Sequence, residues 1–227
     1  FVAQWTGAIN EPLLVRTEVE TATRRETPPS GMDQQLPGNI VMFVVMTLLV
    51  NSAVHLTSER KNGAFRRLMA SPLTPGRILA GKLLGRIVPA TVQVALLFLT
   101  GRILFGVHIG SALPGIILLS GAFILCAAAM GLTMGMWMDD RNHVVAAGVP
   151  LTLGMAALGG CWWPIEIVGP FMQRLGMTLP TGWAMRGYHE LLSFGYGITA
   201  VLDNSALLIA AAFVFTAIAA RRIRPVR

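Results

Sequence analysis

Charged residues are scarce in this sequence, since only 13% of its 227 residues are Asp, Glu, Lys or Arg. A soluble domain carries about 25% charged residues, so the composition argues against that class. The chain is instead 54% hydrophobic, and its mean hydropathy is +0.62. The sequence therefore predicts a membrane protein.

Cysteine is scarce as well, because Cys126 and Cys161 are the only two in the chain. Each lies inside or at the edge of an apolar run. Two cysteines that far apart form neither a disulfide framework nor a metal-ligand spacing. We therefore expect small apolar packing residues at both positions and predict no metal site.

Acids are outnumbered, with 11 Asp and Glu against 18 Lys and Arg and a net charge of +7. The basic residues form no stripe with interleaved aromatics, so nucleic acid is not an expected partner. They lie instead at the ends of apolar stretches, where membrane proteins carry them. The chain begins with Phe1 and shows no signal peptide, so we expect a further segment upstream.

Five apolar stretches are candidates for membrane spans. A bilayer core of about 30 Å needs about 20 apolar residues in a helix. We predict an all-α, polytopic membrane helix bundle. Because five is an odd number, we expect a sixth span in the full-length protein. The predicted spans are about 40–57, 87–105, 114–138, 143–161 and 203–220.

A strongly basic segment, residues 58–86, separates the first two predicted spans. Lys and Arg are enriched in cytoplasmic loops, so this segment is expected inside the cell, where its amphipathic helical pattern suits docking to a partner. One acid, Glu59, is expected at the start of a helix, where its charge would be favourable. The seven basic residues are Arg60, Lys61, Arg66, Arg67, Arg77, Lys82 and Arg86.

The remaining basic residues support the same orientation. With 58–86 inside, twelve Lys and Arg fall on the cytoplasmic side and five on the other, and Arg102 near the outer end of the second span can snorkel to the interface. We therefore expect residues 1–37 to form an extracytoplasmic segment, with a helix around Glu11 to Glu26. Residues 38–220 would form the membrane domain, and residues 221–227 a cytoplasmic tail.

Residues 162–202 are too interrupted for a span and too apolar for a solvated loop. They contain Pro164, Pro170 and Pro180 among several aromatic residues. We expect short re-entrant or interfacial helices at the outer surface. Irregular backbone at membrane depth is tolerated only inside protein or beside a water-filled cavity.

Two short motifs resemble catalytic or nucleotide sites but lack an essential residue. Residues 76–82 match a phosphate-binding loop, but Leu83 stands where Ser or Thr would hold magnesium, and no strand precedes them. His189 and Glu190 begin a zinc-protease motif, but Ser193 replaces its second histidine. We predict no catalytic residue and no cofactor in this chain, and an i,i+4 ion pair of Arg186 with Glu190.

Small and polar residues within the spans leave alternatives open. Gly131 and Gly135 suit close helix packing, either in a dimer or within the chain. Polar groups inside a span usually face the bundle interior or a water-filled path. Asn51, Ser52 and His55 are therefore candidate path-lining residues, while a structural histidine near the interface is the alternative for His55.

The segment 59–82 contains Glu59, Arg60, Gly63, Leu68, Ser71, Pro72, Gly81 and Lys82. At these positions it resembles the coupling segment of ABC transporter permeases of the second export type. Ala64 departs from the resemblance, because that family usually has Thr there. A second patch contains Gly159, Gly160, Pro164, Pro170, Leu179, Pro180 and Thr181, and it is similar to the family's extracytoplasmic gate.

This resemblance implies a subunit of an ATP-driven exporter in the bacterial inner membrane. ATP and Mg would bind to a separate ATP-binding subunit, and a second permease copy would complete a homodimer or heterodimer. The implied gate residues are Gly159, Gly160, Pro164, Pro170 and Pro180. The implied coupling residues are Glu59, Arg60, Gly63, Arg66, Arg67, Leu68, Ser71 and Pro72.

Two other classes of membrane protein are alternatives. An ion-driven secondary transporter would need ionisable residues in mid-membrane, but the second to fourth predicted spans have no Asp, Glu or Lys in their apolar middles. A membrane-embedded enzyme would need a set of catalytic or metal-binding residues. The expected cargo is a drug, lipid, glycan or similar molecule leaving the cytoplasm, with alternating access as the mechanism.

Overall fold

The structure is a computed structural model that describes residues 31–107 and 112–222. Within these ranges every regular element is a helix and no strand occurs. The helix expected around Glu11 to Glu26, most of the segment 1–37 and most of the tail 221–227 lie outside the described residues.

Long helices make up most of the chain. The first is continuous through a π-helical turn, η1, so α2, η1 and α3 form one rod. The elements of the rod are α2 Met32–Met46, η1 Thr47–Asn51 and α3 Ser52–Lys61. The other long helices are α5 Pro75–Phe105, α6 Leu113–Trp137, α7 Arg141–Leu158 and α10 Leu202–Arg221.

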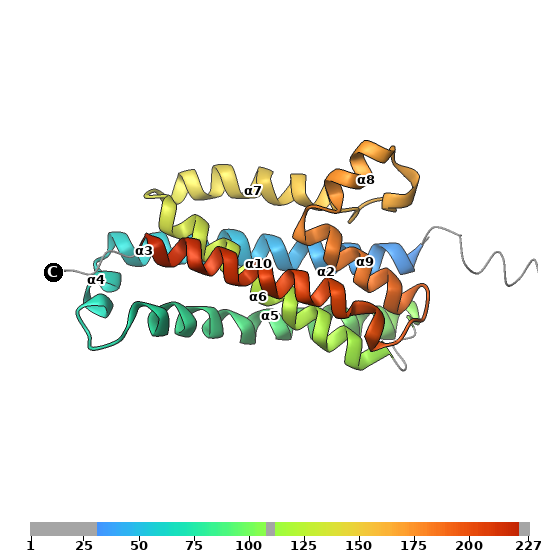
Figure 1. Ribbon diagram of the computed structural model, residues 1–227, viewed down its shortest axis with the longest axis horizontal. Coiled ribbons are helices and arrows are strands. Elements are labelled where there is room, and N and C mark those ends of the chain that lie inside the picture. Colours follow the sequence, from blue (N-terminus) through green and yellow to red (C-terminus); the bar gives the residue numbers. More distant parts are fainter. Residues whose placement is uncertain (1–30, 108–111, 223–227) are drawn as a thin grey trace, which may run out of the picture.

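Short helices occupy the two ends of the bundle. Figure 1 shows the long helices side by side, with α4 at one end and α8 and α9 toward the other. The turn between α6 and α7 and the end of α10 lie at the α4 end. The short elements are α4 Ala64–Met69, η3 Ile165–Ile167, α8 Pro170–Gly176, α9 Pro180–Leu192 and η4 Ile198–Val201.

Helix α6 is the centre of the bundle and packs against α10, α3, α5 and α9. Gly131 and Gly135 explain how closely α3 and η1 approach it. A Cβ at Gly131 would lie 2.4 Å from the carbonyl oxygen of Leu48, and one at Gly135 would lie 2.8 Å from that of Ala53. The sequence left open whether these glycines pack in a dimer or within the chain, and the structure shows them packing within the chain.

Within the described residues, four helical segments are long and apolar enough to cross a membrane. The sequence predicts five, and the difference is the stretch 143–161, which forms α7. That helix has 18 residues and begins with Arg141, Asn142 and His143, so its apolar part is shorter than the roughly 20 residues of a span. The four segments are Gln34–Lys61, Gly76–Phe105, Leu113–Trp137 and Ile198–Arg221.

The basic segment 58–86 differs from the prediction in two ways. Residues 75–86 of this segment belong to the same helix as the next span, since α5 runs without a break from Pro75 to Phe105. Thr74 is the N-cap, and Pro75 takes the first helical position, where proline is favoured. Glu59 lies in the last turn of α3 rather than at a helix start. The expectation that a helix amino terminus favours its charge is therefore wrong.

Candidate functional site

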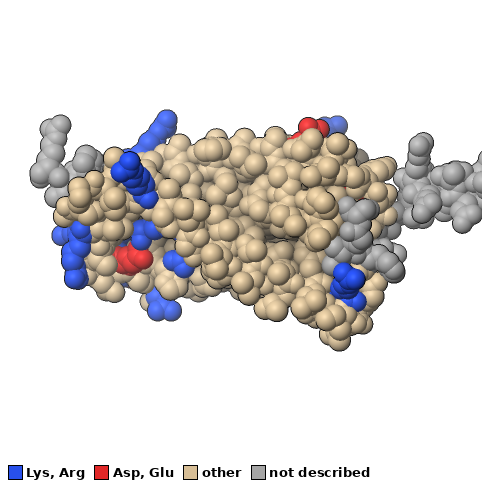
Figure 2. Space-filling view, turned by 90° about the horizontal axis from the view of Figure 1, so that it is seen from below, with Lys and Arg blue, Asp and Glu red and all other residues tan. Residues whose placement is uncertain are grey.

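Charge is concentrated at the α4 end of the bundle. Figure 2 shows Lys and Arg gathered there on the visible face, a broad uncharged middle and few charges near the other end. A wide uncharged band between charged ends suits a bilayer core. The α4 end is therefore the candidate docking end of the molecule.

A tight turn joins α3 to α4. Gly63 has a φ of 71°, a left-handed conformation that glycine adopts without the steric cost of a side chain. Apart from its two chain neighbours, no residue lies within 4 Å of a Cβ placed there, so the turn is open. The family resemblance implies that Gly63 is a coupling residue, and the structure adds this backbone requirement.

Helix α4 is anchored by one buried side chain, and Leu68 and Met69 pack half-buried beside it. Phe65 packs into a second apolar cluster with residues of α3, α5, α6 and α10. Arg66, Arg67 and Pro72 are exposed, and Leu68 and Ser71 are half-buried. The Ser71 hydroxyl donates to the Leu68 carbonyl oxygen at 2.6 Å. These five predicted coupling residues therefore lie at the α4 end of the bundle, and three of them are exposed.

Glu59 and Lys82 form an ion pair that joins α3 to α5. The Lys82 ammonium also lies 5.7 Å from the centre of the Phe65 ring, within the range of a cation–π contact. Lys82 therefore lies within α5, and its ammonium group pairs with the Glu59 carboxylate. Residues 76–82 form the first turns of α5 rather than a phosphate-binding loop.

Arg60 contacts the carboxyl-terminal end of α6. Its Nη1 lies 3.0 Å from the carbonyl oxygens of Gly135 and Met136 and 3.1 Å from that of Met138. Its Nη2 lies 2.9 Å from Asp139 Oδ1. The guanidinium therefore caps carbonyls that a helix end leaves without partners.

Lys61 makes the matching contact to α7. Its Nζ lies 2.6 Å from Asp140 Oδ2, and Asp140 also accepts from the backbone N–H of Asn142 as the N-cap of α7. The hydrogen bond from Lys61 is the largest of the effects that hold the pKa of Asp140 below its ordinary value. Neither acid partner was apparent from the sequence, because both are far away along the chain.

Polar side chains run along the exposed side of the first rod. Asn39, Phe43, Asn51 and His55 are exposed at spacings of four and eight residues. Because an α-helix has 3.6 residues per turn, residues spaced four apart move gradually around the helix axis. The π turn at Thr47–Asn51 accommodates one extra residue and brings the later residues back toward the same side of the rod. We call Asn39, Asn51 and His55 the polar stripe.

Ser52 is separated from the polar stripe. It is buried and faces α6, because a Cβ at Gly131 would come within 2.9 Å of the Ser52 Cβ. Of the three predicted path-lining residues, Asn51 and His55 therefore point away from the chain, and Ser52 packs inside it. This division could not be predicted from the sequence, because all three are polar residues in one apolar run.

The predicted gate residues lie at the end opposite α4. Gly159 and Gly160 follow α7, and a Cβ at Gly159 would lie 2.3 Å from Thr181 Oγ1. Gly160 has a φ of 82°. Pro170 and Pro180 are the first residues of α8 and α9, where proline is well tolerated, and Pro164 directly precedes η3. Gly159 thus packs tightly and Gly160 adopts a left-handed backbone conformation, whereas the prolines begin or precede short elements.

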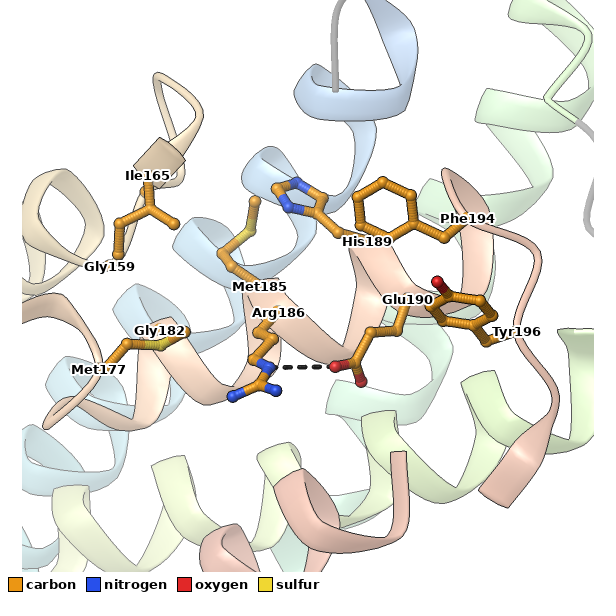
Figure 3. Close-up of a pocket in the computed structure, with 11 residues that line it drawn as sticks. Gly159, Ile165, Met177, Gly182, Met185, Arg186, His189, Glu190, Phe194 and Tyr196 are labelled. Carbon is orange, nitrogen blue, oxygen red and sulfur yellow. Dashed lines mark hydrogen bonds and ion pairs between the residues drawn. The ribbon is translucent and has the colours of Figure 1, made fainter. Parts of the chain in front are cut away.

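A pocket opens beside this junction. Its cavity volume is about 220 Å³, and Gly159, Met185, Arg186, Glu190 and Tyr196 are among its lining residues. Figure 3 shows Arg186 and Glu190 side by side on α9, with Phe194 and Tyr196 beyond them. The predicted ion pair of Arg186 with Glu190 is confirmed, at 3.0 Å from Nε to Oε1.

Glu190 also joins α9 to α10. Asn204 Nδ2 donates to Glu190 Oε2 at 2.9 Å, a contact that the sequence did not indicate. Burial raises the pKa of Glu190 above its ordinary value, and the hydrogen bond from Arg186 opposes that rise. The carboxylate is therefore held in a partly desolvated position between two helices.

Comparison with known proteins identifies the family. Residues 8–221 match the family described as ABC-2 family transporter protein. The chain belongs to this family. The permease is 31% identical over 181 residues to the linearmycin resistance permease protein LnrN of Bacillus subtilis (strain 168). These aligned residues cover 79% of this chain and 46% of LnrN.

A second relative is the inner membrane transport permease YhhJ of Escherichia coli (strain K12). It is 24% identical over 187 residues, which cover 82% of this chain and 50% of YhhJ. The permease thus spans about half the length of both relatives. No solved structure matches it significantly.

The family places the chain in a cellular context. The permease is a multi-pass protein of the cell membrane and a subunit of an ABC transporter, and the family contains no ATPase domain. The resemblance drawn from residues 59–82 and 159–181 is confirmed at the level of the family.

Proposed function

We propose that this permease is the membrane-spanning subunit of an ATP-driven exporter, working with a separate ATP-binding subunit and a second permease copy. The observation that carries the proposal is the α4 end. There a short helix with exposed Arg66 and Arg67 projects from two spanning helices, next to an open turn at Gly63. Such a basic helix suits docking to an acidic groove of a cytoplasmic partner.

The polar stripe supports a path between two permease copies. Asn39, Asn51 and His55 are exposed on a helix of spanning length. Uncovered polar side chains are costly against lipid tails, so they face a water-filled path or a protein partner. The stripe therefore marks the side of the chain that a second copy covers, with the transported molecule passing between the two.

The predicted gate lies at the other end of this path. The tight junction of Gly159 with Thr181 connects α7 to α9, and α2 packs against both helices. In this proposal, ATP binding moves the α4 end, and the bundle transmits the movement to the short helices α8 and α9. A substrate shifts the equilibrium only if it binds the two states with different affinities.

One experiment tests the path. In a complex with the ATP-binding subunit, cysteine replaces Asn51 or, as a matched control, Val92 on the exposed apolar side of α5. We expect a charged aqueous maleimide to modify the cysteine at 51 and not the one at 92. Protection of both positions in every nucleotide state would contradict a water-filled path beside the polar stripe.

A second measurement tests the energy source. We expect the purified permease alone to hydrolyse no ATP, and labelling at position 51 to change when ATP and vanadate trap the complex. An ion-driven transporter would instead respond to a proton or sodium gradient without the ATP-binding subunit. A response of that kind would overturn the proposal.

A further inference from the structure

The last turn of α3 is bonded to two other helices at the point where they meet. Arg60 reaches three carbonyl oxygens around the end of α6 and the carboxylate of Asp139. Lys61 reaches Asp140, the N-cap of α7. Two consecutive residues of α3 therefore contact one helix end and one helix start.

The bonds at Arg60 cannot easily be exchanged for bonds to a partner. Its side chain is 26% exposed, and its four acceptors come from the last turn of α6 and the connection to α7. A helix end carries partial negative charge, which favours a cation there. Hydrogen bonds to a charged donor are about twice as strong as neutral ones, so breaking these bonds is costly. Release of the guanidinium would also leave several carbonyls without its hydrogen bonds.

The connection between α6 and α7 is short. Helix α6 ends at Trp137 and α7 begins at Arg141. Arg60 and Lys61 contact all three residues of the link, Met138, Asp139 and Asp140. Thr57 adds to the contact from one turn earlier, with its hydroxyl 3.4 Å from the carbonyl oxygens of Gly135 and Met138. A displacement of the end of α3 must therefore displace this corner.

The same end of α3 carries α4 across the turn at Gly63. Phe65 of α4 is buried next to Leu56 of α3 and Met136 of α6, which adds an apolar contact to the polar ones. A force on α4 is thus passed to α3 and to the α6–α7 corner through packed and bonded groups.

We infer that Arg60 is a positioning residue that transmits movement of α4 to α7, rather than a contact for the ATP-binding subunit. Lys61 and Asp140 act with it by holding the first turn of α7. This inference rests on the proposed function, and it changes the role assigned to Arg60 within the predicted coupling segment. The exposed Arg66 and Arg67 retain the docking role.

The test measures movement of α7 in the complete complex. Both native cysteines are replaced by alanine, and one cysteine is placed at Ala147, an exposed position on α7. The rate of reaction with an aqueous maleimide is measured without nucleotide and after trapping with ATP and vanadate. In the otherwise unmodified chain we expect the two rates to differ several-fold.

Arg60→Gln should retain the bound ATP-binding subunit and its ATP hydrolysis but reduce that ratio of rates to near one. Arg60→Lys keeps the charge and loses the fork of donors, so it should retain part of the change. The matched control is Arg77→Gln, since Arg77 is an exposed basic residue of the same segment. It should behave like the unmodified chain.

The remaining outcomes would contradict either the role of Arg60 or the proposed function. An unchanged ratio in Arg60→Gln overturns the inference, and so does loss of the ATP-binding subunit from that variant, because Arg60 would then be a docking residue. No nucleotide response in the unmodified chain overturns the proposed function itself. If Arg60→Gln does not fold, Lys61→Gln decides, with a reduced ratio supporting transmission and an unchanged ratio contradicting it.

Discussion

The side-chain amide nitrogen of Gln34 donates a hydrogen bond of 2.7 Å to the carbonyl oxygen of Gly160. Gln34 is 3% exposed and lies near the start of the first rod, while Gly160 lies in the turn after α7. The bond therefore ties the first spanning helix to the predicted gate. Next to it, a Cβ at Gly38 would lie 2.0 Å from the Cys161 carbonyl oxygen, so the two backbones are in close contact.

Replacing Gln34 by Leu should destabilise this junction. The buried carbonyl of Gly160 would lose its partner, at a cost of about 1–3 kcal/mol. We expect a lower thermal midpoint in detergent, measured by the loss of the monodisperse peak after heating. Gln35→Leu is the matched control, because Gln35 is the exposed neighbour. Equal midpoints for the two variants would show that the bond contributes nothing.

Gly131→Ala should weaken the packing of α6 against the first rod. The new Cβ would meet the backbone oxygen of Leu48 at 2.4 Å, and overpacking of this kind costs about 1–3 kcal/mol. Gly121→Ala on the same helix meets nothing within 4 Å and should be neutral or stabilising, by up to about 1 kcal/mol. Thermal unfolding of both variants checks the difference. A stable Gly131→Ala variant would contradict the observed approach of the helices.

Glu59→Lys should separate α3 from α5 by placing two ammonium groups together. We expect less folded protein and a lower thermal midpoint. The reversed pair, Glu59→Lys with Lys82→Glu, should recover much of the loss because the ion pair of α3 with α5 is restored. If Glu59 instead contacts the ATP-binding subunit, the reversal will not restore assembly of the complex.

Cysteine labelling should report the orientation of the chain. A cysteine at Asn62, beside α4, should react in intact cells only after permeabilisation, and one at Asp203 should react from outside. Both positions are exposed, and the native Cys126 and Cys161 are buried, which lowers the background. Reaction at position 62 in intact cells would reverse the orientation inferred from the basic residues.

Glu190 should make stability depend on pH. Because its pKa in the folded protein is raised by burial from the ordinary value of 4.5, the folded state binds more protons than the unfolded state just above that pH. Stability should therefore fall as pH rises from about 4.5 through the folded pKa. Glu190→Gln should reduce this dependence in thermal unfolding measured at several pH values. Asp203→Asn, an exposed acid on α10, should leave the dependence intact.

Part of the architecture follows from local features of the sequence. Long apolar stretches predict spanning helices because a bilayer core requires about 20 apolar residues, and four of the five predicted spans have helices of sufficient length and hydropathy. The exception, 143–161, begins with polar residues. Spacing along one helix likewise predicts the ion pair of Arg186 with Glu190, since residues four apart are neighbours on a helix.

The direction of each helix face could not be predicted in the same way. Apolar residues surround the spanning helices on nearly all sides, so periodicity does not show which side packs. Asn51 is exposed and Ser52 buried because α6 packs on one side of the rod, with Gly131 at the contact. A π turn ends at Asn51 and shifts the register there.

The sequence by itself determined the family, the helical class and the concentration of basic residues at one end. These depend on composition, on motifs and on residues close together in the chain. Only the tertiary structure decided that Arg60 caps α6 and that Glu59 pairs with Lys82. Those partners lie on other helices, and the energy of a charge pair or a helix cap depends on distances that folding alone establishes.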